Sequence, residues 1–152
     1  MIAQMKKYIL IYSYDNTMNE PERVAEIKKY AKANDLKIYS VGFYHKWCDK
    51  NINASPLETF AWFRNAELVI TDTFHGSVLS IVTNAPLIVK LKENTNKLLW
   101  LLKEYSLENR IINSFAEIES LAKEKIDFKQ VNDIVRMKRE NSLQYLESAL
   151  NG

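Results

Sequence analysis

The sequence contains little cysteine and little glycine. Its 152 residues include a single cysteine, Cys48, so neither an intramolecular disulfide nor a CxxC zinc or redox pair is available. The three glycines, Gly42, Gly76 and Gly152, stand far apart, which excludes a phosphate-binding P-loop and a GxGxxG dinucleotide motif. The net charge is only +2 and the basic residues do not cluster, so we expect no nucleic-acid partner.

Long apolar runs are missing as well. No apolar stretch approaches the roughly 18 residues of a membrane span. The N-terminus leads directly into a strand-like segment rather than a signal peptide, so we expect a cytoplasmic protein without a transmembrane span. A composition of 47% hydrophobic and 26% charged residues is that of one globular domain, which at this length buries a core without disulfides or metal.

Apolar strand-like segments alternate with helical ones along the chain. The expected strands are residues 8–12, 36–42, 67–71 and 86–89, with 110–112 as a short last strand. The first expected helix begins at Pro21, and the others cover residues 56–65, 74–83, 97–104 and 115–123. This rhythm predicts an α/β fold with a doubly wound, Rossmann-like parallel sheet and helices on both faces.

A long helical tail follows this α/β region. The apolar positions of residues 131–150 form two groups, separated by the charged residues 136–140. A helix packed along one sheet rarely interrupts its apolar stripe in this way. Two interpretations remain open: the middle of the helix is solvated, or the helix crosses an edge and reaches a second body.

One strand-to-helix turn concentrates the polar chemistry of the chain. In doubly wound sheets ligands bind at the carboxyl ends of the strands, which singles out the loops 13–19, 43–54, 71–76 and 90–96. Residues 71–77 (TDTFHGS) bring hydroxyls, a carboxylate, an imidazole and a glycine into the third of these loops. The first turn of a helix offers unpaired N–H groups and a partial positive charge, so we expect it to hold an anion.

Structural roles compete with functional ones in this turn. Asp72 or Thr73 could serve only as the N-cap of the following helix. Gly76 either lets a ligand approach the backbone or lets the helix pack closely on the sheet. His75 is a candidate general acid or a hydrogen-bonded structural residue.

Candidates outside the turn are weaker. Arg110 is suited to bidentate contact with a phosphate or carboxylate, or to an ordinary surface salt bridge. Tyr12 and Tyr14 either line a sugar ring or pack in the core. His45 and Cys48 are too few for a zinc site, which generally needs four ligands.

Several segments resemble the C-terminal half of the polysaccharide pyruvyl transferase family. They are residues 55–56 (SP) at a helix start, 65–77 (NAELVITDTFHGS), 84–89 (NAPLIV), 107–110 (LENR) and 139–146 (RENSLQYL). The similarity extends over most of the chain from about Tyr8. It implies a GT-B-like enzyme, in which two Rossmann-type domains enclose the active site.

The resemblance also implies a reaction. Members transfer the pyruvyl group of phosphoenolpyruvate, a co-substrate, to a pair of hydroxyls on a cell-surface polysaccharide or its precursor, forming a ketal and releasing phosphate. No cofactor or metal is implied. The expected catalytic residues are His75, as acid/base or phosphate donor, and Asp72, which orients the turn. The expected substrate-binding residues are Thr71, Thr73, Gly76, Ser77 and Arg110.

One position departs from the family pattern. A branch of the family has arginine two residues before the histidine, where this chain has Thr73, so the identity of the donor stays open. The alternatives are half of a nucleotide-sugar-dependent glycosyltransferase and a non-catalytic binding module. A receiver module is disfavoured because Asp15 is the single acid after the first strand and no lysine follows residues 110–112 directly.

The length limits what this chain contributes. A family enzyme needs two domains, whereas 152 residues hold one. We therefore expect residues 1–152 to form a single donor-side domain. The N-terminal half, which binds the saccharide acceptor, would come from a missing domain or a partner chain, and the isolated chain would be inactive.

Overall fold

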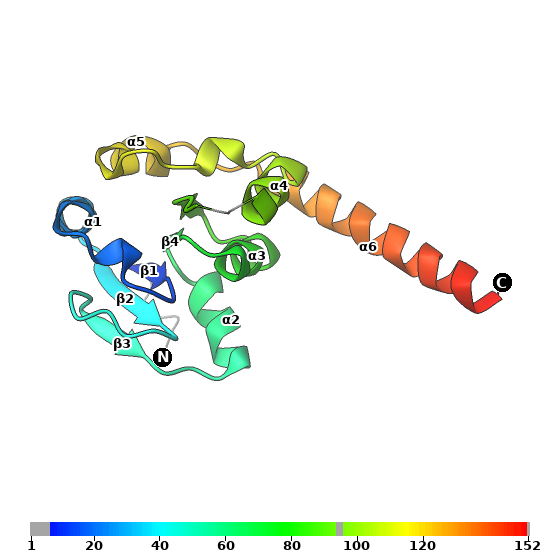
Figure 1. The fold of residues 1–152 in the computed structure, drawn as a ribbon, viewed down its shortest axis with the longest axis horizontal. Coiled ribbons are helices and arrows are strands. Elements are labelled where there is room, and N and C mark those ends of the chain that lie inside the picture. The colour runs from blue at the N-terminus through cyan, green and yellow to red at the C-terminus, as the bar shows by residue number, and fades with distance from the viewer. Residues whose placement is uncertain (1–6, 94–95, 152) are drawn as a thin grey trace.

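The protein forms one parallel sheet covered by helices on both faces (Figure 1). The structure is a computed structural model that describes residues 7–93 and 96–151, apart from the side chains of residues 145 and 151. The strands are β1 (Tyr8–Tyr12), β2 (Lys37–Val41), β3 (Lys50–Ile52), β4 (Leu68–Thr71) and β5 (Leu87–Val89). They are ordered β3-β2-β1-β4-β5, and every neighbouring pair is parallel. The predicted Rossmann-like α/β fold is confirmed.

The side chains of β1 show how the two faces are built. Tyr8, Leu10 and Tyr12 join one apolar core, whereas Ile9 and Ile11 join the other, because successive side chains of a strand point to opposite faces. The first core packs against α2 (Pro56–Arg64), α3 (Phe74–Thr83) and α4 (Asn96–Glu104). The second packs against α1 (Pro21–Ala33) and α5 (Ile118–Lys123). All five side chains of β1 are buried, which explains its continuous apolar sequence.

Local signals set the helix boundaries. Pro21 and Pro56 occupy the first turns of α1 and α2, where a missing N–H costs no hydrogen bond. Ser55 and Glu58 form a capping box at the start of α2. Asn84 ends α3 in the left-handed conformation, with φ of 56°. These positions agree with the helices predicted from the sequence.

Two short segments differ from the prediction. Residues 110–112 do not form a strand; Glu108–Arg110 is a 3-10 helix, and only an isolated bridge joins Ile111 to Val89 of β5. In contrast, β3 lies within the predicted loop 43–54. Its sequence, KNI, has neither an apolar run nor an apolar alternation that would indicate a strand. In the structure its three residues are exposed or half-buried.

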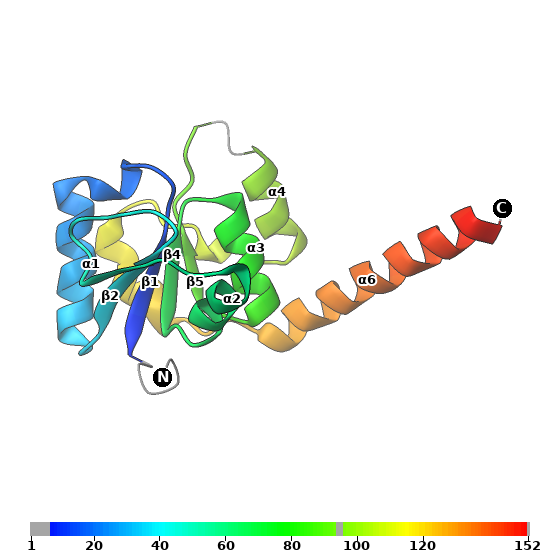
Figure 2. The same cartoon turned by 90° about the horizontal axis from the view of Figure 1, so that it is seen from below.

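The tail is one continuous helix, α6 (Phe128–Asn151), that leaves the body of the domain (Figure 2). Val131 is buried, and the amides of Asn132 and Asn84 exchange hydrogen bonds of 2.9 and 3.0 Å. Further along, Lys138 pairs with Glu104 of α4 at 2.9 Å. The described side chains from residue 139 onward are exposed. No helix in the described residues is both long enough and apolar enough to cross a membrane.

Candidate functional site

The candidate site lies where the carboxyl ends of β1 and β4 meet. These two strands are neighbours, with Tyr12 opposite Thr71, although β2 and β3 separate them in the sequence. The chain leaves β1 toward β2 on one side and leaves β4 toward β5 on the other. This is the topological switch point, where ligands of open α/β sheets bind.

The turn after β4 is held by hydrogen bonds among its own hydroxyls. Thr71 Oγ1 donates to the carbonyl oxygen of Tyr12 at 2.6 Å and accepts from the backbone N–H of Thr73 at 3.1 Å. Thr73 caps α3, since its Oγ1 accepts from the N–H of Gly76 at 2.8 Å. Ser77 Oγ donates to the carbonyl oxygen of Thr73 at 3.0 Å. Thr73 rather than Asp72 is therefore the N-cap.

Gly76 is required by close packing. A Cβ on Gly76 would overlap Thr71 Oγ1 and would lie 2.8 Å from Thr73 Oγ1 and 2.9 Å from a ring carbon of Tyr12. Real Cβ atoms are not found so close to other heavy atoms. The sequence left two roles open for Gly76, ligand approach to the backbone and close packing of the helix on the sheet. The structure shows the second of these, the close packing of α3 on the sheet.

Gly76→Ala is expected to destabilise the protein by about 1–3 kcal/mol, because the added methyl group forces the turn apart. Alanine is otherwise the better helix former by about 1 kcal/mol, so an unchanged or raised stability would contradict the packing argument. Urea unfolding measures the effect. The double variant Thr71→Ala/Gly76→Ala is the control: removing Thr71 Oγ1 relieves part of the overlap, so its loss should be smaller than the sum of the single losses.

His75 is the exposed residue of this turn that carries acid–base chemistry. Its side chain is exposed, and its ring centroid lies 6.3 Å from that of Tyr12. The first four N–H groups of a helix have no carbonyl one turn earlier. Because Thr73 satisfies those of Gly76 and Ser77, the N–H groups of Phe74 and His75 are the ones available to an anion.

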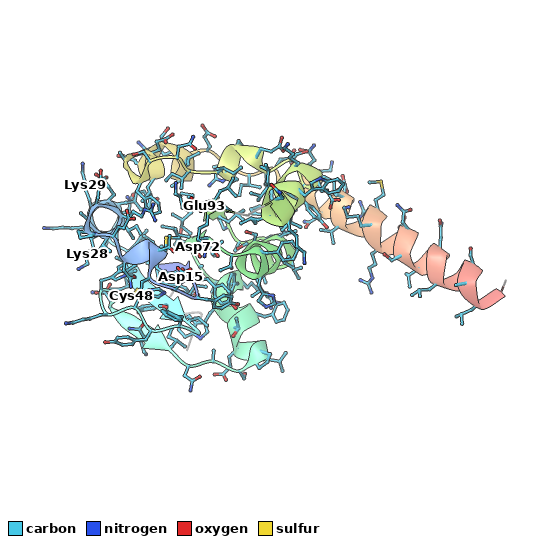
Figure 3. All side chains as sticks on the ribbon, viewed as in Figure 1. Asp15, Lys28, Lys29, Cys48, Asp72 and Glu93 are labelled. Carbon is cyan, nitrogen blue, oxygen red and sulfur yellow. The ribbon has the colours of Figure 1, made fainter. Side chains whose placement is uncertain are left out.

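A second set of polar side chains, the Asp72 cluster, joins three loops at the same edge. It consists of Ser13, Asp15, Asp72 and Lys92. Ser13 Oγ donates to Asp72 Oδ2 at 3.0 Å, and Lys92 Nζ lies 2.9 Å from Asp15 Oδ2 and 3.6 Å from Asp72 Oδ2. Figure 3 shows Asp15 and Asp72 near each other at this end of the sheet.

Asp72 is buried without enough partners. It is 2% exposed, and its Oδ1 has no hydrogen-bond partner among the described residues. Burial raises the pKa of Asp72 although Ser13 and Lys92 act in the opposite direction. Asp15 behaves differently: its hydrogen bonds to Thr17 and Lys92 lower its pKa. The cluster therefore holds one carboxylate that Lys92 stabilises and one that burial disfavours.

Asp72→Asn is expected to stabilise the protein at pH 7. A carboxyl group whose pKa is raised by folding takes up protons more readily when folded, so its ionisation opposes folding as the pH rises above about 4. Asparagine keeps an acceptor for Ser13 without the charge. The difference in free energy of unfolding between variant and parent should thus grow from pH 4 to pH 7.

Asp15→Asn is the matched control, because it removes the other carboxylate on Lys92. A lowered pKa gives the opposite sign: the charge of Asp15 stabilises the folded chain above about pH 4, and this benefit is lost only as the pH falls below that value. This variant should therefore be less stable than the parent by a similar amount at pH 4 and at pH 7. Denaturant unfolding at both pH values measures both variants. A loss of stability in Asp72→Asn at pH 7 would show that Lys92 outweighs the burial of Asp72.

His45, in the second loop, is hydrogen-bonded to the first loop at the carboxyl ends of the strands. It is fully buried, and its Nε2 donates to the carbonyl oxygen of Ser13 at 3.0 Å. Its Nδ1 lies 2.9 Å from Oδ1 of Asn19, and that oxygen accepts from Trp47 Nε1 at 2.6 Å. The sequence placed these residues in carboxyl-end loops but did not indicate their contacts. Residues 94–95 of the fourth loop lie outside the described residues.

Arg110 does not join the other predicted site residues. Its side chain is 1% exposed, and it donates to the backbone carbonyl oxygens of Leu87 at 2.8 Å, Leu121 at 2.7 Å and Glu124 at 2.9 Å. Leu87 begins β5, so the guanidinium lies away from the carboxyl ends of the strands. We therefore replace the predicted phosphate contact, and the alternative surface salt bridge, with a structural role.

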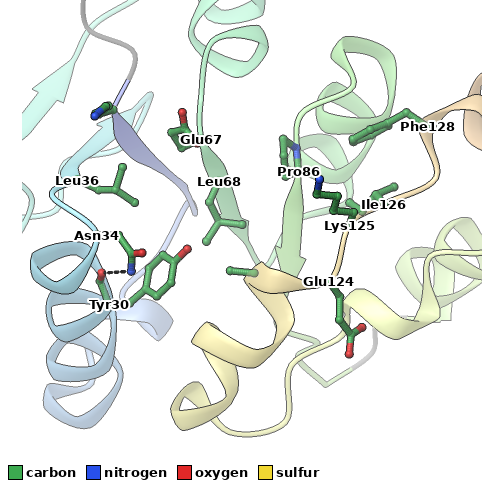
Figure 4. A pocket seen from close by; sticks show the side chains of 12 residues that line it. Tyr30, Asn34, Leu36, Glu67, Leu68, Pro86, Glu124, Lys125, Ile126 and Phe128 are labelled. Carbon is green, nitrogen blue, oxygen red and sulfur yellow. Dashed lines mark hydrogen bonds between the residues drawn. The ribbon is translucent and has the colours of Figure 1, made fainter.

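A concavity of about 500 Å³ lies at the opposite end of the strands (Figure 4). Its lining includes Glu67 and Pro86, which precede β4 and β5, and Tyr30 and Lys125. It is therefore at the amino ends of the strands, away from the switch point. In the described part of the chain, no three His, Cys, Asp or Glu side chains gather as they would around a metal ion.

The sequence model of the polysaccharide pyruvyl transferase family matches residues 3–90. The chain belongs to this family. The match includes β1, β4 and the turn 71–77, so the candidate site lies within the part shared with the family. No curated protein matches the sequence.

Two solved structures share the fold of this pyruvyl transferase family member. The "Glycotransferase of kitacinnamycin" superposes with a TM-score of 0.57 at 12% identity, over 86% of this chain and 38% of that chain. The C-terminal CMP-Kdo binding domain of WaaA from Acinetobacter baumannii gives 0.55 at 10% identity, over 88% of this chain and 95% of that domain. The chain thus spans well under half of the first protein and nearly all of the second domain.

Proposed function

We propose that this chain is the donor side of a polysaccharide pyruvyl transferase that uses phosphoenolpyruvate. The observation that carries the proposal is His75, exposed in the first turn of α3 at the switch point of the sheet. Membership of the family supports a pyruvyl transfer to a polysaccharide or its precursor. The product would be a pyruvyl ketal on two vicinal hydroxyls, and phosphate would be released.

The start of α3 is suited to a phosphate group. The N–H groups of Phe74 and His75 lie in the first turn of α3 and have no carbonyl one turn earlier, and the helix places partial positive charge there. Thr71, Thr73 and Ser77 are buried and bonded within the turn. We propose that they and Gly76 contribute to binding by fixing these N–H groups in place. Backbone donors would thus hold the phosphate in the absence of an arginine at Thr73.

Ketal formation needs one proton in a particular place. Protonation of the methylene carbon of phosphoenolpyruvate produces a methyl group and an oxocarbenium carbon, which one sugar hydroxyl attacks. The bond between this carbon and the phosphate oxygen then breaks. The neighbouring hydroxyl forms the second C–O bond. The hydroxyls release two protons: one replaces the proton spent on carbon, and the other leaves with phosphate. We assign the delivery of the first proton to His75.

Asp72 acts on this turn from within the protein. It lies directly before the N-cap Thr73 and is tied to Ser13 and Lys92. We propose that it positions the turn and holds Lys92 near the start of α3, where the ammonium favours an anionic donor. This is a positioning role rather than a contact with the reacting atoms.

The acceptor would need a second surface. This chain spans 38% of a structural neighbour, and in the proposed enzyme a further domain or partner chain binds most of the saccharide. Without that half the attacking hydroxyls are not held beside the donor. We therefore propose that the isolated chain binds phosphoenolpyruvate but does not turn it over.

Titration by NMR tests the donor. Phosphoenolpyruvate is expected to bind the 152-residue chain saturably and to shift the backbone amide signals of Phe74 and His75. CMP-Kdo is the comparison ligand, since a domain of similar fold binds it. Saturable binding of CMP-Kdo with no response to phosphoenolpyruvate would replace the proposal with nucleotide-sugar-dependent transfer. No response to either would leave a non-catalytic module.

A further inference from the structure

Two tyrosine hydroxyls form a pair at the end of β1. The side-chain oxygen of Tyr12 lies 2.6 Å from that of Tyr14, and the two rings meet edge to face with their centroids 5.1 Å apart. Ser13, between them in the sequence, turns to Asp72 instead. Side chains two positions apart in an extended chain share a face. Tyr12 and Tyr14 therefore act as one unit at the carboxyl end of the strand.

Tyr12 connects this pair to the start of α3. It is 7% exposed and belongs to the core between the sheet and the helices α2, α3 and α4. One of its ring carbons lies 2.9 Å from the position that a Cβ of Gly76 would occupy. The centroid of its ring lies 6.3 Å from that of His75. The Tyr12 ring thus contacts the first turn of α3 and carries Tyr14 next to it.

Burial decides which tyrosine donates within the pair. Among the described residues, Tyr14 is the only hydrogen-bond partner of the Tyr12 hydroxyl. If Tyr14 donated to Tyr12, the hydrogen of Tyr12 would have no acceptor within a nearly buried side chain, which is unfavourable. Tyr12 is therefore the donor and Tyr14 the acceptor. A phenol has one hydrogen of its own, so the O–H of Tyr14 is directed away from Tyr12.

Tyr14 offers this O–H to the outside of the domain. Its side chain is 49% exposed, although its oxygen is fixed by Tyr12. A group that is already held in place loses little conformational freedom when a ligand binds. A hydroxyl that accepts one hydrogen bond also donates the next one more strongly. Tyr14 is thus a pre-oriented hydrogen-bond donor beside the first turn of α3.

An anionic oxygen is the acceptor that such a donor favours. Hydrogen bonds to ionised groups are roughly twice as strong as those between neutral groups, so a sugar hydroxyl would be held less well. The start of α3 attracts negative charge, yet the turn 71–77 contains no lysine or arginine. Phosphoenolpyruvate has anionic oxygens on its phosphate and on its carboxylate.

We propose that Tyr14 donates a hydrogen bond to an anionic oxygen of phosphoenolpyruvate bound at the start of α3. The backbone N–H groups of Phe74 and His75 hold the donor from one side, and the phenol of Tyr14 holds it from the end of β1. This inference rests on the proposed function and adds to it a side chain that selects an anionic donor.

Tyr14→Phe tests the contact, because it removes the hydroxyl and keeps the ring. The 152-residue chain is titrated with phosphoenolpyruvate, and the amide signals of Phe74 and His75 are followed by NMR. Tyr14→Phe should weaken binding about ten-fold. Tyr44→Phe, at another exposed tyrosine on the loop after β2, should leave binding unchanged. In a parallel titration with inorganic phosphate, a similar loss places the contact on the phosphate, and no loss places it on the carboxylate.

Tyr12→Phe separates a ligand contact from an effect on the shape of the turn. This variant also breaks the pair, but it leaves Tyr14 with its hydroxyl, so binding should weaken less than in Tyr14→Phe. A loss in Tyr12→Phe as large as that in Tyr14→Phe would overturn the proposal, since the pair would then act only through packing on α3.

The parent chain distinguishes this inference from the proposed function. If the parent binds phosphoenolpyruvate and Tyr14→Phe binds it equally well, the donor stands and Tyr14 is not a contact. If the parent does not bind phosphoenolpyruvate, the proposed donor is wrong and the contact with Tyr14 is rejected with it.

Discussion

His75→Gln is expected to lower the rate of pyruvyl transfer by about 10²–10⁴-fold, the usual contribution of a general acid. Glutamine retains a hydrogen-bond donor of similar reach but has no titratable proton for the methylene carbon of phosphoenolpyruvate. The rate is measured as phosphate release with an acceptor glycan, in the presence of the polypeptide that supplies the acceptor-binding half.

Stability serves as the control for this variant. Because the side chain of His75 is exposed and lies in the first turn of α3, its replacement should leave the unfolding temperature nearly unchanged. The His75→Gln chain should also still bind phosphoenolpyruvate, since the backbone N–H groups remain. A complemented activity that is unaffected by the substitution would remove His75 from its proposed role.

Arg110→Leu is expected to destabilise the protein by about 3–5 kcal/mol, since it removes three hydrogen bonds to backbone carbonyl groups and replaces a long buried side chain with a shorter one. The guanidinium satisfies the carbonyl oxygens of Leu87, Leu121 and Glu124, which belong to β5 and to the end of α5. It thereby ties β5 to the end of α5. The midpoint temperature of thermal unfolding should be lower than that of the parent by about 10 °C.

Arg139→Leu is the matched control, because Arg139 is exposed on α6. Its replacement should change stability by less than about 0.5 kcal/mol. If Arg110→Leu instead unfolds like the parent and loses phosphoenolpyruvate binding, the structural role is wrong and Arg110 returns as a substrate contact.

Only part of the turn 71–77 could be predicted from the sequence. The polar residues of this turn stood together in the sequence, between an apolar strand and an amphipathic helix, so their place at a carboxyl end was predictable. Whether Asp72 or Thr73 capped the helix was not, because both residue types are good caps. The cap is Thr73, and Asp72 turns to Ser13 and Lys92 instead.

The features that could not be predicted from the sequence depend on contacts between distant segments. Ser13 and Asp72 are 59 residues apart, and the register of β1 against β4 brings them together. The sequence predicts Arg110 as a phosphate or carboxylate contact, or as part of a surface salt bridge, because the partners that bury it come from β5 and the end of α5 rather than from its own loop. The short edge strand β3 depends on pairing with β2 and has no apolar pattern of its own. None of these contacts leaves a local signal in the sequence.

The sequence by itself determined the strands β1, β2, β4 and β5 with the helices between them, the family resemblance and the turn around His75, because each depends on residues that are neighbours in the chain. The three scattered glycines also left Gly76 as the one glycine in a candidate site. Only the tertiary structure decided that Gly76 is held by contact with Thr71 and Tyr12 and that Arg110 is buried. Those outcomes depend on how the helices pack on the sheet, which side-chain volumes and hydrogen bonds between remote segments settle together.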